Sequence, residues 1–173
     1  MSLPKINLRE ATIDDVSLLR YWDEQPHVVA SDPDDEWDWE TEIPKKHDWR
    51  EMLIAELDGR PVGIIQIIDP ALEETHYWGE VPHHLRAIDI WIGEANDLGK
   101  GYGTRMMVLA LDKCFQHEDV TAVLIDPLAS NTRAHRFYER LGFRFIEKRH
   151  FNDEECFVYS LSREDYINSA SLL

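Results

Sequence analysis

Apolar and polar positions along the first 50 residues predict a strand, a helix and a long loop. Residues 5–8 alternate polar and apolar, as a strand does, and residues 16–24 carry an apolar stripe with helical spacing. Thr12, followed three positions later by Asp15, is similar to a capping box at the start of that helix. Residues 26–44 are rich in Asp, Glu and Trp and begin and end with proline, which predicts an irregular segment.

Three apolar runs in the middle of the chain predict strands. Residues 52–57 and 61–68 are joined around Asp58-Gly59, a pair typical of a hairpin turn. A second loop over residues 69–85 leads to residues 87–92, which predict a buried strand interrupted by one carboxylate, Asp89.

The last third of the chain alternates predicted helices and strands. We expect helices over residues 104–116 and 131–141, the second ended by Gly142, and a strand over residues 120–125 between them. Residues 143–147 and 156–161 predict a closing strand pair, and a short helix follows from Ser162. This order predicts one α/β domain over residues 1–173, with a central mixed, largely antiparallel sheet flanked by helices.

The charge of the chain limits the partners that it can have. Eighteen Lys and Arg against 34 Asp and Glu give a net charge of −16, and residues 1–97 alone have 8 basic and 23 acidic side chains. Such a surface argues against binding nucleic acid or anionic membranes, which require basic faces. A cationic small molecule is favoured, although acidity also serves solubility alone.

The remaining composition predicts a cytoplasmic protein without a metal. The two cysteines, Cys114 and Cys156, form no CxxC pair, and the adjacent His83 and His84 have no further ligands at metal-binding spacing. No apolar run approaches the roughly 20 residues that span a bilayer, and the start of the chain lacks the apolar core of a signal peptide.

Three glycines mark the turn between the strand at residues 87–92 and the following helix. Gly99, Gly101 and Gly103 would let backbone N–H groups approach an anion at a helix N-terminus. The segment is not a Walker A loop, and Thr104 stands where a Rossmann motif requires its third glycine. A pyrophosphate cradle of another kind and a simple tight turn remain the two interpretations.

Two segments in this order carry a resemblance to a known family. Leu98-Gly-Lys-Gly-Tyr-Gly-Thr-Arg, followed by Asn131-Thr-Arg-Ala-His-Arg-Phe-Tyr-Glu-Arg-Leu-Gly-Phe, resembles the pyrophosphate loop and the following helix of GNAT N-acetyltransferases. Leu98 replaces the usual Gln or Arg, so backbone amides would carry the cradle. Arg86-Ala-Ile-Asp89, Leu before the glycines and Asp126-Pro127 are similar to the aminoglycoside 6′-N-acetyltransferase branch.

The resemblance implies acetyl-CoA as co-substrate and assigns residues to it. Residues 98–143 would form the acetyl-CoA-binding core and residues 1–97 mainly the acceptor side. Tyr138 would protonate the departing thiolate, and packing beside Phe137 is the less favoured alternative. Asn131 is also suited to cap its helix. The cofactor-binding residues implied are Ile92, Gly99, Lys100, Gly101, Tyr102, Gly103, Thr104, Asn131 and Arg136.

Two carboxylates are the candidate catalytic groups for an amine acceptor. Asp89 and Asp126 would lie in one cleft if their strands are neighbours, and could hold an ammonium group and accept its proton. Alternatively, Asp89 pairs with Arg86 or a backbone group, and Asp126 only forms a turn. The loop aromatics would stack on a cationic sugar or merely anchor the loops. The predicted substrate-binding residues are Trp37, Trp39, Tyr77, Trp78, Asp89 and Asp126.

The sequence therefore predicts direct acetyl transfer from acetyl-CoA to a primary amine, with the 6′-amino group of an aminoglycoside as the favoured acceptor. A siderophore-type acetyltransferase acting on N6-hydroxylysine is the first alternative, and a non-catalytic acetyl-CoA-binding regulator that grips a basic protein is the second. We expect a monomer or a homodimer.

Overall fold

The computed structural model describes residues 4–33 and 35–170. The strands and helices in chain order are β1 (Ile6–Glu10), α1 (Val16–Asp23), α2 (Pro26–Ser31), α3 (Trp39–Glu42), β2 (Arg50–Leu57), β3 (Arg60–Ile68), β4 (Leu85–Ile92), α4 (Tyr102–Gln116), β5 (Ala122–Ile125), α5 (Thr132–Arg140), β6 (Arg144–Phe151), β7 (Glu154–Ser162) and α6 (Arg163–Ala170). Single-turn 3-10 helices, η1 (Ile13–Asp15) and η2 (Ala95–Asp97), precede α1 and α4.

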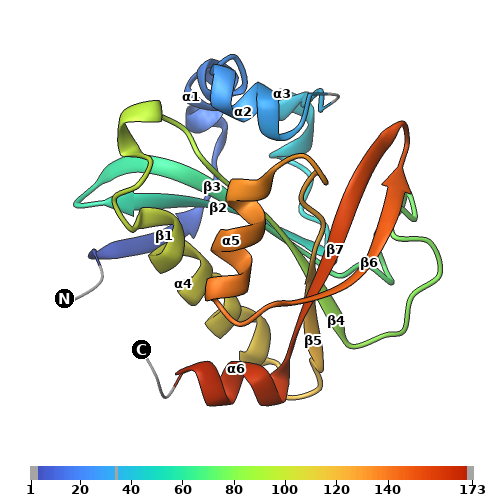
Figure 1. Cartoon of the computed structure of the whole chain (residues 1–173). Helices are drawn as coiled ribbons and strands as arrows, with labels where there is room; N and C mark the ends of the chain where they lie inside the picture. The colour runs from blue at the N-terminus through green and yellow to red at the C-terminus, as the bar shows by residue number, and fades with distance from the viewer. Residues whose placement is uncertain (1–3, 34, 171–173) are drawn as a thin grey trace. The chain divides into compact units, whose positions relative to one another are not determined.

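The seven strands have the hydrogen-bonded order β1-β2-β3-β4-β5-β7-β6 (Figure 1). β1 and β2 are antiparallel and β4 and β5 are parallel, so the sheet is mixed, as predicted, and the α/β class is confirmed. The chain divides into two compact units, which we describe in turn. The first comprises Met1–Ile67 and Asp89–Ala110, and the second Ile68–Ile88 and Leu111–Leu173.

The hairpin of β2 and β3 in the first unit forms at the predicted turn. Asp58 and Gly59 both have positive φ, 50° and 83°, the combination that a tight two-residue turn between twisted strands requires. Ahead of the hairpin, the predicted cap is also present, because the Thr12 N–H donates to the Asp15 carboxylate over 2.8 Å. The Arg9 guanidinium makes two 2.8 Å bonds to the same carboxylate.

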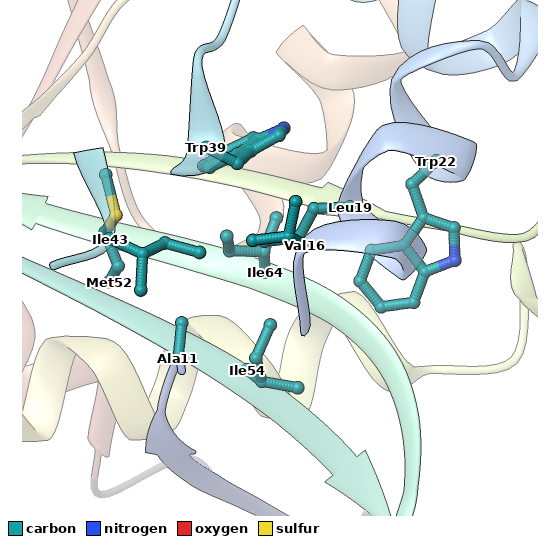
Figure 2. Close-up of a cluster of buried hydrophobic side chains, with 9 residues drawn as sticks. All are labelled: Ala11, Val16, Leu19, Trp22, Trp39, Ile43, Met52, Ile54 and Ile64. Atoms are coloured by element: carbon teal, nitrogen blue, oxygen red, sulfur yellow. The ribbon is translucent and has the colours of Figure 1, made fainter. Parts of the chain in front are cut away.

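The core of the first unit lies between helices α1 and α3 and strands β2 and β3. Figure 2 shows Trp39 and Leu19 lying over Ile64 of β3. Trp22 is also fully buried, and a Cβ at Gly93 would meet its ring at 2.0–2.2 Å, so only glycine lets the chain after β4 pass this ring. The buried residues of the cluster are Ala11, Val16, Leu19, Trp22, Trp39, Ile43, Met52, Ile54 and Ile64.

The prediction of an irregular segment over residues 26–44 is only partly right. Two short helices, α2 and α3, form there. Pro26 occupies the first turn of α2, where its missing N–H costs nothing, and Asp38 caps α3 by accepting the Thr41 N–H over 3.3 Å. Helices of six and four residues are too short for a helical repeat of apolar positions to be recognised in the sequence.

In the second unit, β5 pairs antiparallel with β7, and β7 with β6. Helix α5 begins and ends where predicted: the Asn131 side chain accepts the Ala134 N–H over 3.2 Å, and Gly142 follows with φ of 98°. The closing strands are longer than predicted and meet at Asn152, whose φ is 54°. The buried residues of this unit's cluster are Trp78, Ala87, Leu124, Phe151, Cys156 and Val158.

Over the described ranges 4–33 and 35–170, the longest apolar helical segments fall short of what crossing a bilayer requires.

Candidate active site

Carboxylates and tryptophans gather in the first unit around the end of β4, in what we call the acidic–aromatic cluster. Trp37 stacks on Trp39 with ring centroids 4.8 Å apart, and Trp39 lies 6.2 Å from Trp91. The Trp39 indole N–H donates to Asp23 over 2.6 Å, and the Trp37 indole N–H donates to Asp35. With Asp89 on β4, the members are Asp23, Asp35, Trp37, Trp39, Asp89 and Trp91.

The negative charge of Asp89 contributes to the raised pKa of Asp35 within this cluster. Desolvation of the Asp35 carboxylate, together with the negative charges of Asp32, Asp89 and Asp23, raises the pKa of Asp35 to about 7. Desolvation likewise raises the pKa of Asp23. Several carboxylates that repel one another hold a cation well, because a bound ammonium group relieves their repulsion.

The predicted residues of the cluster differ in exposure. Trp39 is fully buried in the core, whereas Trp37 and Asp89 are half-buried. The prediction that Asp89 lies on a buried strand is therefore only partly right: burial ends at Ile88 and the rest of β4 is partly exposed. Arg86, the alternative partner considered for Asp89, instead bonds Asp69 over 3.3 Å.

A second group of predicted residues, the tyrosine cluster, lies in the second unit. The Tyr77 hydroxyl donates to Asp126 over 2.5 Å, and the Tyr77 ring stacks on Phe151 at 4.4 Å. Trp78 contacts both rings edge-on and is buried in the core, so it supports Tyr77 rather than facing solvent. Phe151 was not identified from the sequence, because nothing in its own segment marks it as a neighbour of a residue 74 positions earlier.

The glycine-rich turn has the geometry of an anion cradle. Gly99 and Gly101 have φ of 73° and 82°, which side-chain-bearing residues rarely adopt. Helix α4 begins at Tyr102, and its Arg105 N–H is bonded to the Gly101 carbonyl. The N–H groups of residues 102–104 precede this bond and belong to the first helical turn, where no intrahelical acceptor exists. The turn therefore fits a pyrophosphate, with the exposed Lys100 beside it.

Two contacts beside the turn were missed by the sequence reasoning. Arg60 at the start of β3 holds the buried Asp97 through two bonds of 2.8 and 3.1 Å, two residues before the first glycine of the turn. His27 of α2 bonds the Ile92 carbonyl through Nε2 over 2.8 Å. The predicted cofactor residue Ile92 thus already has one backbone contact. The residues of each pair are more than 35 positions apart in the sequence, so no local sequence pattern predicts these contacts.

The predicted residues of α5 lie in the second unit. Asn131 caps the helix, so that alternative role is present, and Arg136 is exposed. Tyr138 is 8% exposed and packs edge-on against Phe137 and Phe143 at 5.2 and 5.7 Å. Its role as general acid stays a prediction, as do the cofactor contacts of α5.

Asp89 and Asp126 belong to different compact units. Each lies in an acidic and aromatic setting within its own unit, and the common cleft stays a prediction. Among residues 4–33 and 35–170, no group of three or more His, Cys, Asp and Glu side chains is arranged to hold a metal ion.

Comparison with known proteins places these features in a family context. Residues 12–151 match the family described as Acetyltransferase (GNAT) domain. The aminoglycoside N(6′)-acetyltransferase type 1 of Klebsiella pneumoniae is 30% identical over 152 residues, which cover 80% of this chain and 73% of that protein. The lysine N-acyltransferase MbtK of Mycobacterium tuberculosis is 24% identical over 172 residues, 91% of this chain and 78% of that protein.

Solved structures agree with these sequence relatives. The aminoglycoside acetyltransferase AAC(6′)-Ib in complex with coenzyme A and kanamycin superposes with a TM-score of 0.84 at 25% identity, covering 96% of this chain and 99% of that one.

Proposed function

The chain belongs to the GNAT acetyltransferase family, and from this premise we propose that it transfers the acetyl group of acetyl-CoA to the 6′-amino group of an aminoglycoside. The observation that carries the proposal is the acidic–aromatic cluster, in which carboxylates and tryptophan rings suit a cationic sugar. The relatives that act on aminoglycosides or bind kanamycin support the same acceptor.

Acetyl-CoA binding is assigned to the glycine-rich turn. The amides of Gly99–Thr104 would bind the pyrophosphate, helped by Lys100 and by the partial positive charge at the start of α4. Ile92 in the first unit, and Asn131 and Arg136 in the second, are each candidates for a further contact with acetyl-CoA. Bound acetyl-CoA supplies a thioester carbonyl carbon for attack.

Acceptor activation is assigned to the carboxylates. In the first unit, Asp89 would hold the ammonium form of the acceptor and Trp37 would contact its sugar ring. In the second unit, Asp126 and Tyr77 are the candidate residues for the same two roles. An ammonium nitrogen has no lone pair, so Asp89 must accept one proton, directly or through water, before the amine attacks. As the C–N bond forms and the C–S bond breaks, Tyr138 would protonate the departing thiolate. The nitrogen would release its second proton to water, from which the tyrosine regains its proton. No covalent acyl-enzyme is involved.

An amine panel tests the acceptor. Thiol release from acetyl-CoA is measured with kanamycin, tobramycin, lysine, N6-hydroxylysine and spermidine. We expect kcat/KM to be highest for kanamycin-type compounds, and mass spectrometry to find one acetyl group on the 6′-nitrogen. If another amine is acetylated and none of the aminoglycosides is, the proposed substrate is wrong, while the assignment as an acetyltransferase stands.

Acylation of a lysine-derived amine is the second candidate. It is favoured by the likeness to MbtK over 91% of this chain. In the same panel it predicts preference for N6-hydroxylysine over kanamycin, so one experiment separates the two acceptors.

A further inference from the structure

Gln66 of β3 is a buried polar residue of the first unit whose amide has no role in the proposed mechanism. Its side chain has no exposed surface, and within the described part of the chain neither its amide nitrogen nor its amide oxygen has a hydrogen-bond partner. Every other position from 62 to 68 in this strand is glycine, Val or Ile. An amide buried without a partner is costly, and a methionine of similar length would fill the same space without that cost.

The register of β3 and β4 identifies the neighbour of Gln66. The two strands are adjacent in the sheet, and the Gly93 N–H donates to the Val62 carbonyl over 3.0 Å. Two positions further along each strand, Ile64 and Trp91 pack in the same core cluster. Residue numbers therefore rise along β3 as they fall along the facing β4, as in an antiparallel pair.

One further step along the same face leads to Gln66 on β3 and Asp89 on β4. The step after that leads to Ile68 and Ala87, which again share one cluster. Side chains at alternate positions of a strand share a face, so Gln66 and Asp89 are opposite each other between two packed pairs. Residues in this relation have Cβ atoms about 5 Å apart, within reach of a glutamine amide.

We propose that Gln66 is the positioning residue of Asp89, donating an amide N–H to one carboxylate oxygen when the other oxygen takes the ammonium group of the acceptor. The inference rests on the acceptor role proposed for Asp89. A donor on the second oxygen would fix the carboxylate plane and its lone pairs toward the amine and favour the ionised form that binds it. The amide that is unpartnered in the acceptor-free protein would gain its partner on binding.

Replacement of the amide without loss of volume tests this role. Gln66→Met is expected to unfold at the same temperature as the wild type or higher, because it removes an unpartnered amide. Its kcat/KM for the amine is expected to fall about tenfold, the loss of one charge-assisted hydrogen bond. The acidic limb of the pH profile should move to higher pH. Asp35, whose pKa the charge of Asp89 helps to raise, is left unchanged throughout.

Ile64→Met is the matched control, because it alters packing in the same strand and cluster without touching an amide. It should keep the pH profile of the wild type. Wild-type kcat/KM and pH profile in folded Gln66→Met would overturn the proposal and leave Gln66 a packing residue.

The placement can be tested without any acceptor. In protein labelled with 13C at the aspartate carboxyls, and with Asp89 assigned through Asp89→Asn, Gln66→Glu places a carboxylate opposite Asp89. The two carboxyl groups should then titrate as a coupled pair, so the titration of Asp89 should shift by about one unit or more. Absence of a shift would overturn the proposal whatever the substrate. If kanamycin is not acetylated, the kinetic comparison uses the amine that is, so failure of the substrate and failure of the positioning role remain distinct.

Discussion

Tyr77 and Asp126 form a hydrogen bond of 2.5 Å between residues 49 positions apart in the sequence. The tyrosine ring is held by stacking on Phe151, and its hydroxyl restricts the carboxylate that follows β5. Tyr77 is 42% exposed, so the pair lies where a ligand can reach it. A carboxylate held in one orientation loses less freedom when it binds an ammonium group.

Tyr77→Phe should lower kcat/KM for the acceptor about tenfold, because it deletes the hydrogen bond and keeps the stack. Hydrogen bonds to charged groups contribute about 1.5–3 kcal/mol, and the exposure of Tyr77 places this one at the lower end. Initial rates with kanamycin and a thermal melt measure the two effects. Tyr77→Leu, which also loses the stack, should lower the melting temperature further. Equal kcat/KM for Tyr77→Phe and wild type would contradict a role in binding.

Acceptor binding should strengthen between pH 6 and pH 8. The pKa of Asp35 is about 7, so its carboxyl is largely neutral at pH 6 and charged at pH 8, while an acceptor amine stays cationic. Calorimetric titration with kanamycin measures the change, and Asp35→Asn should flatten it. Glu36→Gln removes a neighbouring charge outside the acidic–aromatic cluster, and it should keep the pH dependence of the wild type.

The same carboxyl should make folding stability depend on pH. Its folded pKa of about 7 lies above its ordinary 3.8, so the unfolded chain gives up this proton first as pH rises. The associated stability is complete below pH 3.8 and is lost as pH rises toward 7. Asp35→Asn should therefore gain stability over the wild type at pH 8 relative to pH 4, measured by urea unfolding. A constant difference between the two proteins would contradict the raised pKa.

Local chemistry accounts for what the sequence predicted correctly. The turn at Asp58-Gly59, the cap at Asn131 and the stop at Gly142 each depend on residues within a few positions, and all three form. Those signals, with the strand and helix order, were sufficient for the fold class. The glycines of the turn before α4 were likewise predicted from their own conformational freedom.

Partners distant in the sequence account for what it did not predict. Phe151 beside Tyr77 and Asp97 beside Arg60 are brought together only by the fold, as is Asp35, on which the charge of Asp89 acts. Trp39 was predicted to contact substrate because it lies among acids, but tertiary packing places it in the core. The acidic character of residues 1–97 favoured a cationic acceptor, and Asp89 was identified from the sequence, but Asp23 and Asp35 were found as members of the cluster only in the structure.

Gly101→Ala should weaken acetyl-CoA binding. The φ of 82° at this position costs a residue with a Cβ about 1–2 kcal/mol, so the turn would relax away from its cradle geometry. Gly59→Ala is the matched control, with φ of 83° and no heavy atom within 4 Å of the added Cβ. Both variants should lose similar stability, and only Gly101→Ala should raise the Kd for acetyl-CoA in calorimetry. Equal Kd values for Gly101→Ala and the wild type would contradict a role of this turn in binding acetyl-CoA.

Asp97→Asn should also weaken acetyl-CoA binding, although Asp97 is buried and points to Arg60. Asparagine can accept only one of the two bonds from the guanidinium, so the substitution would loosen the segment that enters the glycine-rich turn. Because Arg60 is half-exposed, the loss of stability should be about 1 kcal/mol. Calorimetry and urea unfolding measure the two effects. Raising the salt concentration should shrink the stability difference between variant and wild type, since screening weakens the exposed end of the pair.

Tyr138→Phe should lower kcat about a hundredfold or more while leaving the Kd for acetyl-CoA unchanged, if its hydroxyl protonates the departing thiolate. The ring packs edge-on against Phe137 and Phe143, and phenylalanine keeps those contacts, so the fold should be retained. A structural role alone predicts a small fall in kcat with lower thermal stability. Acetyl thioesters with different leaving thiols distinguish the catalytic role from the packing role. A more acidic thiol needs less protonation as it leaves, so its thioester should restore much of the rate that Tyr138→Phe loses. A rate defect that does not depend on the acidity of the thiol would assign Tyr138 to packing.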